Sequence, residues 1–120
     1  MFYAEKNNGA YFNNQRMRVS KKRNIDECLF ATGGKDQIKN NLNTRKSGSA
    51  ALDMAYVGAG RFDGYFQKNL NIWDIAAGII IVEEAGGKIN NIDNSSKAGI
   101  DILAGSNSIY QKMQENLNNF

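Results

Sequence analysis

The sequence predicts an α/β fold in which a sheet and helices form layers. The 120 residues suffice for one modest domain, and a hydrophobic fraction of 42% is ordinary for a globular protein. Stretches with strand-like patterns alternate with stretches whose apolar residues recur at helical spacing. After an N-terminal hairpin their order is strand, helix, strand, helix, strand, strand, helix, which is typical of a layered α/β domain.

Residues 9–19 alternate apolar and polar side chains on both sides of Asn13-Asn14-Gln15. Because Asn tolerates the left-handed backbone of tight turns, this pattern predicts two short strands joined by a turn. A basic cluster of Arg16, Arg18, Lys21, Lys22 and Arg23 follows. It would suit a phosphate backbone, but no aromatic residue interleaves it. We therefore favour a solvated hairpin edge whose charge blocks unwanted strand pairing.

Residues 28–32 read as a short buried strand. Residues 33–47 are polar, and only Ile38 and Leu42 are spaced like one face of a helix. This segment is predicted to be a loop or a meagre helix.

Residues 48–61 are rich in Ala and carry apolar residues at helical spacing, with Ser49 placed to cap the helix start. Residues 62–66 read as a strand. The run 72–86 is long, and Gly86-Gly87 supplies a left-handed end, so we predict a helix rather than a buried strand. Residues 88–92 and 101–104 are predicted strands, and 106–117 is a predicted amphipathic helix.

The composition excludes several classes of function. There is no His, which closes Ser-His-Asp and Cys-His schemes and imidazole-bound metals. The lone Cys28 lies in an apolar stretch and predicts a buried, inert thiol. No apolar run approaches the roughly 20 residues that span a bilayer, and the N-terminus lacks the layout of a secretory signal. We therefore expect a soluble cytoplasmic protein without a membrane partner, and a net charge of +3 is too small to imply nucleic acid.

One carboxylate stands out in the stretch NIWDIAAG. Asp74 follows the only Trp and precedes the most apolar segment. From the residues alone, Asp74 is interpreted as a helix-start residue whose negative charge stabilises the positive end of the helix. Glu83 and Glu84 are expected to be solvated, and neither Asp53 nor Asp63 has a partner spaced as an acid/base couple. The residues alone therefore indicate one suggestive carboxylate and no complete site.

The blocks GSAALDMAYVGAGRFDGYF (48–66) and WDIAAGIIIVEEAGG (73–87) resemble the C-terminal half of the inositol monophosphatase family. The pattern W-D-x-A-A-G followed by E-A-G-G is long and specific. The resemblance implies the C-terminal part of the inositol monophosphatase / fructose-1,6-bisphosphatase-like fold. It divides the chain into 1–32, a hairpin and strand from the end of the family's N-terminal domain, 33–47, a shortened connection, and 48–120, the α/β C-terminal domain.

The resemblance also implies chemistry. In the family, Mg²⁺ ions held by carboxylates activate a water that hydrolyses a phosphate monoester. Asp74 matches a metal ligand, and Trp73 is expected to pack against it and position it. Gly48, Ser49 and Ala50 match the segment that contacts the inositol ring. Gln67 stands where the family commonly has a Glu that binds substrate hydroxyls. The implied substrate is a small phosphorylated polyol or a nucleotide.

Two departures qualify this expectation. Gln67 lacks the charge of a Glu, and no D-P-[IL]-D-G-T motif, which supplies most of the family's metal ligands, occurs in the sequence. Because one carboxylate holds Mg²⁺ weakly, we expect the chain to be inactive alone, as a C-terminal fragment. The partners that the resemblance implies are an N-terminal half or, since the family often forms homodimers, a second copy of the chain. Two alternatives remain: a non-catalytic fragment, and a module that binds RNA or a transcription complex.

Overall fold

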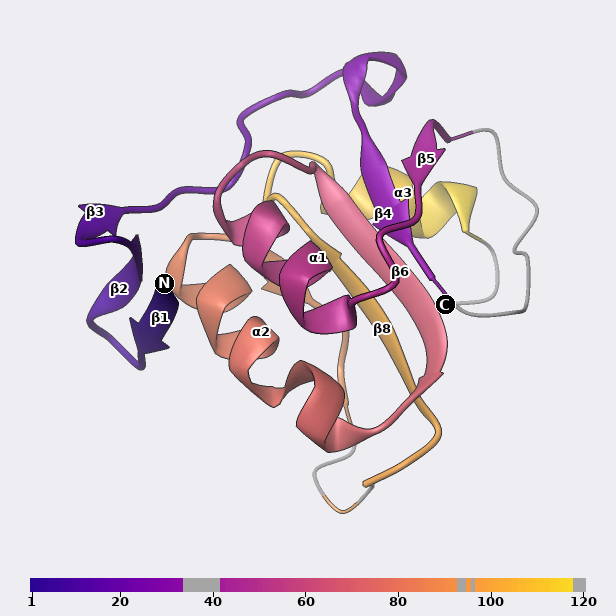
Figure 1. Ribbon diagram of the computed structural model, residues 1–120. Helices are drawn as coiled ribbons and strands as arrows, with labels where there is room; N and C mark the ends of the chain where they lie inside the picture. The colour runs from indigo at the N-terminus through magenta and orange to yellow at the C-terminus, as the bar shows by residue number, and fades with distance from the viewer. Residues whose placement is uncertain (34–41, 93–94, 96, 118–120) are drawn as a thin grey trace.

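The computed structural model describes residues 1–33, 42–92, 95 and 97–117. A small N-terminal sheet packs on a pair of helices, this pair covers one face of a larger sheet, and a third helix covers the opposite face (Figure 1). The layered α/β architecture predicted from the sequence is therefore confirmed. In the part of the chain that the structure describes, no helix is long and apolar enough to cross a membrane.

The larger sheet has the strand order β5-β4-β6-β8-β7. Its strands are β4 (Phe30–Thr32), β5 (Thr44–Arg45), β6 (Gly64–Leu70), β7 (Lys88–Ile89) and β8 (Ile100–Gly105). β4 pairs in parallel with both β5 and β6, whereas β8 runs antiparallel to β6 and to β7. The carboxyl ends of β4 and β6 therefore meet at one edge of the sheet, which is where parallel sheets place their sites.

The strands differ from prediction mainly in their ends. β6 continues past Phe66 to Leu70 across a register shift, at which Asn69 adopts a left-handed φ of 62°. β7 is shorter than predicted. β5 lies within the predicted loop or meagre helix 33–47 and was not predicted as a strand, and residues 34–41 of that segment lie outside the described residues.

The helices α1 (Ala50–Gly58) and α2 (Ile72–Glu84) form where predicted. α2 ends as expected before Gly86, whose φ of 94° suits only glycine without strain. The two helices pack closely because Gly78 has no side chain. A Cβ there would lie 2.8 Å from the Cβ of Met54 on α1. Both helices bury apolar side chains against the sheet, around Tyr65 and Ile102.

The third helix, α3 (Tyr110–Asn116), is shorter than predicted and covers the other face of the sheet. Its Met113 packs against Phe66 and Phe30. Cys28 belongs to the same apolar cluster and is 2% exposed. The predicted burial of the thiol is therefore confirmed, and burial together with the charge of Asp63 raises the pKa of Cys28 to about 11.

The N-terminal sheet consists of β1 (Phe2–Glu5), which was not predicted, and the predicted hairpin strands β2 (Gly9–Phe12) and β3 (Gln15–Arg16). Asn13 and Asn14 have φ values of 48° and 69°, as a tight turn of this kind requires. The sheet lies against α1 and α2. Glu84, expected to be solvated, instead accepts a hydrogen bond of 2.8 Å from the backbone N–H of Gly9 and fixes the hairpin to the end of α2.

The segment between the hairpin and β4 contains one short 3₁₀ helix, η1 (Ile25–Glu27), capped by the side chain of Asn24. Before it, the chain passes the carboxyl end of α2, where the N–H of Val19 donates to the carbonyl of Ala85 at 3.0 Å. This strap, residues 18–23, carries most of the basic cluster.

Candidate active site

A polar pocket of about 450 Å³ opens where the carboxyl ends of β4 and β6 meet the amino-terminal ends of α1 and α2. All five residues that the sequence analysis assigned to a site line it: Gly48, Ser49, Ala50, Gln67 and Asp74. The other lining residues are Gly33, Ala51, Asp53, Leu70 and Trp73. The fold thus brings residues from four separate segments to one cavity, and the assigned residues Gly48 and Asp74 lie 26 positions apart in the sequence.

The first wall is the start of α1. Gly48 has a φ of 86°, a conformation open to glycine, and turns the chain into the helix. The hydroxyl of Ser49 then accepts the N–H of Leu52 at 3.2 Å, which confirms the predicted N-cap. The first backbone N–H groups of a helix have no partner within it, so Ala50 and Ala51 present donors at the positive end of α1.

Asp53 lies in the same wall and was missed by the sequence analysis. Its side chain is only 1% exposed, and its Oδ1 accepts a hydrogen bond of 2.5 Å from the hydroxyl of Ser47. Burial raises the pKa of Asp53, although the bond from Ser47 opposes the shift. Its burial could have been predicted from the helical spacing, because Asp53 lies one turn before Val57, on the face of α1 that meets the sheet.

The floor of the pocket holds Gln67 on β6. Its Oε1 accepts a hydrogen bond from the hydroxyl of Tyr65, two residues back on the same face of the strand. Burial, together with the charges of Asp53 and Asp74, raises the pKa of Tyr65, so this hydroxyl remains a donor. The Gln67 amide therefore keeps its N–H₂ for a ligand. Gly33 makes room for it, since a Cβ at position 33 would lie 2.5 Å from Oε1.

The second wall is the first turn of α2. Asp74 is exposed and lies in the first turn of α2, so its charge is at the positive end of the helix as predicted. Within the described residues its carboxylate makes no hydrogen bond, so it does not cap the helix by hydrogen bonding. Trp73 is 70% exposed. Position 73 faces solvent when Ile75 and Gly78 face the core, so the packing of its ring against Asp74 stays a prediction. Trp73 forms part of the pocket rim.

The carboxylates of the pocket meet only part of what a magnesium ion needs. Mg²⁺ takes six oxygen ligands in octahedral geometry, usually with carboxylates among them. Among the described residues, no group of three or more His, Cys, Asp or Glu side chains is arranged to hold a metal. Asp53 is buried and bonded to Ser47, which leaves Asp74 as the open carboxylate of the pocket. These residues do not form a complete magnesium site by themselves.

Comparison with known sequences gives a consistent result. The sequence model of the inositol monophosphatase family matches residues 1–119. An inositol-1-monophosphatase of Caulobacter vibrioides is 38% identical over 136 residues, covering 98% of this chain and 53% of the relative. A Nus factor SuhB of Escherichia coli is 35% identical over 134 residues, covering 98% of this chain and 50% of the relative.

Solved structures agree with the sequences. The extragenic suppressor protein SuhB of Bartonella henselae superposes with a TM-score of 0.85 at 39% identity, covering 98% of this chain and 53% of that one. An IMPase of Thermotoga maritima superposes with a TM-score of 0.86 at 36% identity, covering 98% and 50%. The chain thus spans about half the length of the relatives it matches.

Proposed function

Because the chain belongs to the inositol monophosphatase family, we propose that its pocket is the alcohol-binding side of a phosphate monoesterase site to which Asp74 contributes one Mg²⁺ ligand. The observation that supports this most is the convergence of Gly48, Ser49, Ala50, Gln67 and Asp74 on one cavity. The reaction is hydrolysis: the oxygen of a water bonds to phosphorus, the ester P–O bond breaks, and the alcohol leaves.

The walls favour an anionic, hydroxyl-rich ligand. The amino-terminal ends of α1 and α2 both open on the pocket, and each carries roughly half a positive charge. A volume of about 450 Å³ suits a small phosphorylated polyol or a nucleotide. Lining by serine, glutamine and backbone groups supplies donors and acceptors for such a molecule, whereas Leu70 and Trp73 offer the large apolar surfaces among the described lining residues.

Gln67 is proposed to act as a hydrogen-bond donor to an oxygen of the substrate. Its oxygen is occupied by the hydroxyl of Tyr65, so the amide N–H₂ donates to a substrate oxygen. A Glu at this position would instead accept from the substrate hydroxyl. The chain is therefore expected to prefer a substrate with an acceptor oxygen at this point, such as an ether oxygen or a hydroxyl whose proton is donated elsewhere.

The magnesium chemistry of the family supplies charge neutralisation at the phosphate and an activated water. Asp74, an exposed carboxylate in the lining of the pocket, is proposed to hold one coordination position, and the described residues do not supply the rest. We therefore expect the 120-residue chain to bind a phosphorylated polyol without hydrolysing it at a measurable rate.

The experiment separates binding from turnover. Inositol 1-phosphate is titrated into the ¹⁵N-labelled chain with Mg²⁺, and phosphate release is followed in parallel. We expect the amides of Gly48, Ser49 and Gln67 to shift saturably while phosphate release stays at the level of the protein-free blank. Absence of shifts at these residues would overturn the assignment of the pocket. Mg²⁺-dependent release that disappears in Asp74→Asn would overturn the expected inactivity.

A further inference from the structure

A second cavity lies at the opposite end of α2 from the candidate active site. It is a groove of about 590 Å³ between the strap, the carboxyl end of α2 and the segment that leads into α3. Four basic side chains line it: Arg18, Lys21, Arg23 and Lys112. Since α2 has 13 residues, the groove is about 20 Å from the Asp74 pocket along the helix.

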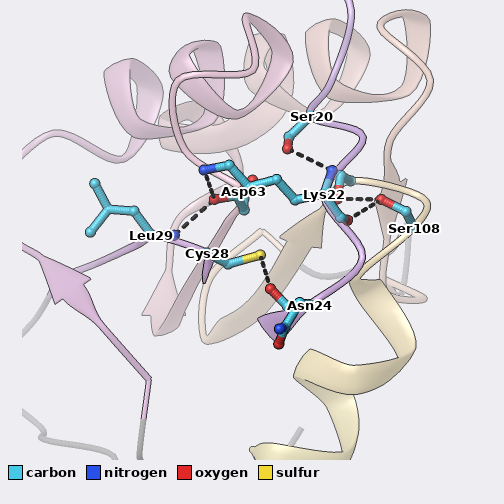
Figure 2. Close-up of polar contacts among 8 residues, drawn as sticks. Ser20, Lys22, Asn24, Cys28, Leu29, Asp63 and Ser108 are labelled. Atoms are coloured by element: carbon cyan, nitrogen blue, oxygen red, sulfur yellow. Dashed lines mark hydrogen bonds and ion pairs between the residues drawn. The ribbon is translucent and has the colours of Figure 1, made fainter. Parts of the chain in front are cut away.

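The basic side chains gather here because the strap is held at several points (Figure 2). The Nζ of Lys22 lies 3.4 Å from Oδ2 of the buried Asp63, and the hydroxyl of Ser108 donates to the carbonyl of Lys22 at 2.7 Å. In an extended segment neighbouring side chains point to opposite sides. Lys22 turns inward to Asp63, which places Lys21 and Arg23 on the groove side. The basic cluster is exposed, as expected from the sequence, but only Arg16 lies in the hairpin and the rest belongs to the strap.

The positive charge of the groove is not compensated within the described residues. No carboxylate lines it, and none there forms an ion pair with these four side chains. Lys112 donates one hydrogen bond to the carbonyl of Arg23, which leaves its charge unneutralised. The carboxyl end of α2 carries only about half a negative charge. Complementing that helix end would take a single cation, so helix capping does not explain four.

We propose that this groove binds a small molecule that carries two or more phosphate groups. One phosphate monoester brings about two negative charges, so two are needed to balance four cations. The volume exceeds what one phosphate fills and lies in the usual range for a small ligand. Ser20 adds a hydroxyl donor, because its oxygen accepts from the N–H of Lys22 and its own proton has no partner among the described residues, whereas the proton of Ser108 already goes to the carbonyl of Lys22. Among the described residues no aromatic side chain lines the groove, so these residues offer phosphate contacts and no surface on which a base would stack.

The test uses inorganic tripolyphosphate as the probe and the full 120-residue chain. Calorimetry is expected to give saturable binding at one site, weakening with salt. In ¹⁵N spectra the amides of Ser20, Gly86 and Ser108 shift, whereas those of Gly33, Gly48 and Ala51 in the first pocket do not. The double variant Lys21→Gln/Arg23→Gln is expected to bind about tenfold more weakly or worse, since each lost contact is charge-assisted.

A matched control carries the same loss of charge elsewhere. Lys6→Gln/Lys97→Gln removes two exposed lysines that do not line the groove, and should bind tripolyphosphate like the parent. Equal weakening in both double variants, shifts confined to the first pocket, or no saturable binding would each overturn the proposal. The proposal would also be overturned if a single-stranded RNA shifted the amides of Ser20, Gly86 and Ser108 and tripolyphosphate did not bind. Arg18→Gln gives a second test if the Lys21/Arg23 variant does not keep the parent's urea midpoint.

Discussion

The hydroxyl of Ser47 donates a hydrogen bond of 2.5 Å to Oδ1 of Asp53, whose carboxyl group is buried in the wall of the same pocket that Asp74 lines. The two carboxylates among the described lining residues therefore differ. Asp53 is enclosed and serves the local structure of α1, whereas Asp74 is open to a ligand. Several consequences of this arrangement and of the surrounding fold are measurable.

The buried Asp53 should make the protein less stable as pH rises. Burial raises its pKa above the ordinary value of 3.8, so the folded chain binds this proton more tightly than the unfolded chain does. The free energy of unfolding therefore falls as pH rises from below 3.8 through the raised pKa. Asp53→Asn cannot titrate, so this fall in the free energy of unfolding should disappear in the variant. In the parent it amounts to about 1.4 kcal/mol for each tenfold difference in proton affinity between the folded and the unfolded chain. Urea titrations below and above this window measure it, with exposed Asp26→Asn as the control; equal pH dependence in parent and Asp53→Asn would contradict the account.

Asp63 should matter more to stability than its ion-pair partner. Its Oδ2 accepts the backbone N–H of Leu29 at 2.8 Å as well as contacting Lys22 (Figure 2). Asp63→Ala leaves this N–H without its partner and is expected to cost about 2–4 kcal/mol. Lys22 is half-exposed, so Lys22→Met should cost under about 1 kcal/mol in urea unfolding. Equal losses in the two variants would show that the ion pair, and not the bond to Leu29, is what stabilises this region.

The N-terminal sheet should loosen in acid before the rest of the chain. Backbone N–H groups of Asn7 and Gly9 lower the pKa of Glu84 below its ordinary value of 4.5. Stability from this contact is present above pH 4.5 and is lost as pH falls through the lowered pKa. Hydrogen exchange should therefore quicken in β1 and β2 at low pH while β6 and β8 remain protected. Glu84→Gln should show faster exchange in β1 and β2 already at neutral pH; the neighbouring exposed Glu83→Gln should not.

Gly78 should tolerate no side chain. In an open helix, replacing Gly by Ala stabilises by about 1 kcal/mol. At position 78 the new Cβ would lie 2.8 Å from Met54, so α1 and α2 would have to move apart. Gly78→Ala is expected to destabilise by about 1–3 kcal/mol in urea unfolding. Ala77→Ser, at an exposed position of the same helix, should change stability by roughly 0.5 kcal/mol at most. A stabilised Gly78→Ala variant would contradict the close packing of the two helices.

The parts of the fold that the sequence predicted well are those with local causes. Ser49 and Gly86 mark the start of α1 and the end of α2 through capping and backbone conformation. The turn at Asn13-Asn14 is likewise local. β5 is a strand only because Thr44 and Arg45 pair with β4, and the far end of β6 depends on pairing with β8 across a register shift. Partners distant in sequence decide such pairs, so alternation within the segment does not reveal them.

The candidate site was likewise predicted only in part. Resemblance to a family motif assigned Asp74 and Gln67, and the structure brings both to one pocket. It did not assign Asp53, since burial of that carboxyl follows from how α1 lies on the sheet and from Ser47 reaching across the helix start. Nor did it anticipate that Trp73 is open to solvent, because the residue pattern indicates which side of a helix is apolar but not what covers it.

The central claim is that the Asp74 pocket is one side of a phosphatase site. A chimera tests it, in which residues 1–120 replace the matching part of the Caulobacter vibrioides inositol-1-monophosphatase, to which this chain is 38% identical. We expect Mg²⁺-dependent phosphate release from inositol 1-phosphate that falls about a hundredfold or more in Asp74→Asn and is unchanged in Asp26→Asn. An active chimera in which Asp74→Asn releases phosphate as fast as its parent would contradict the claim.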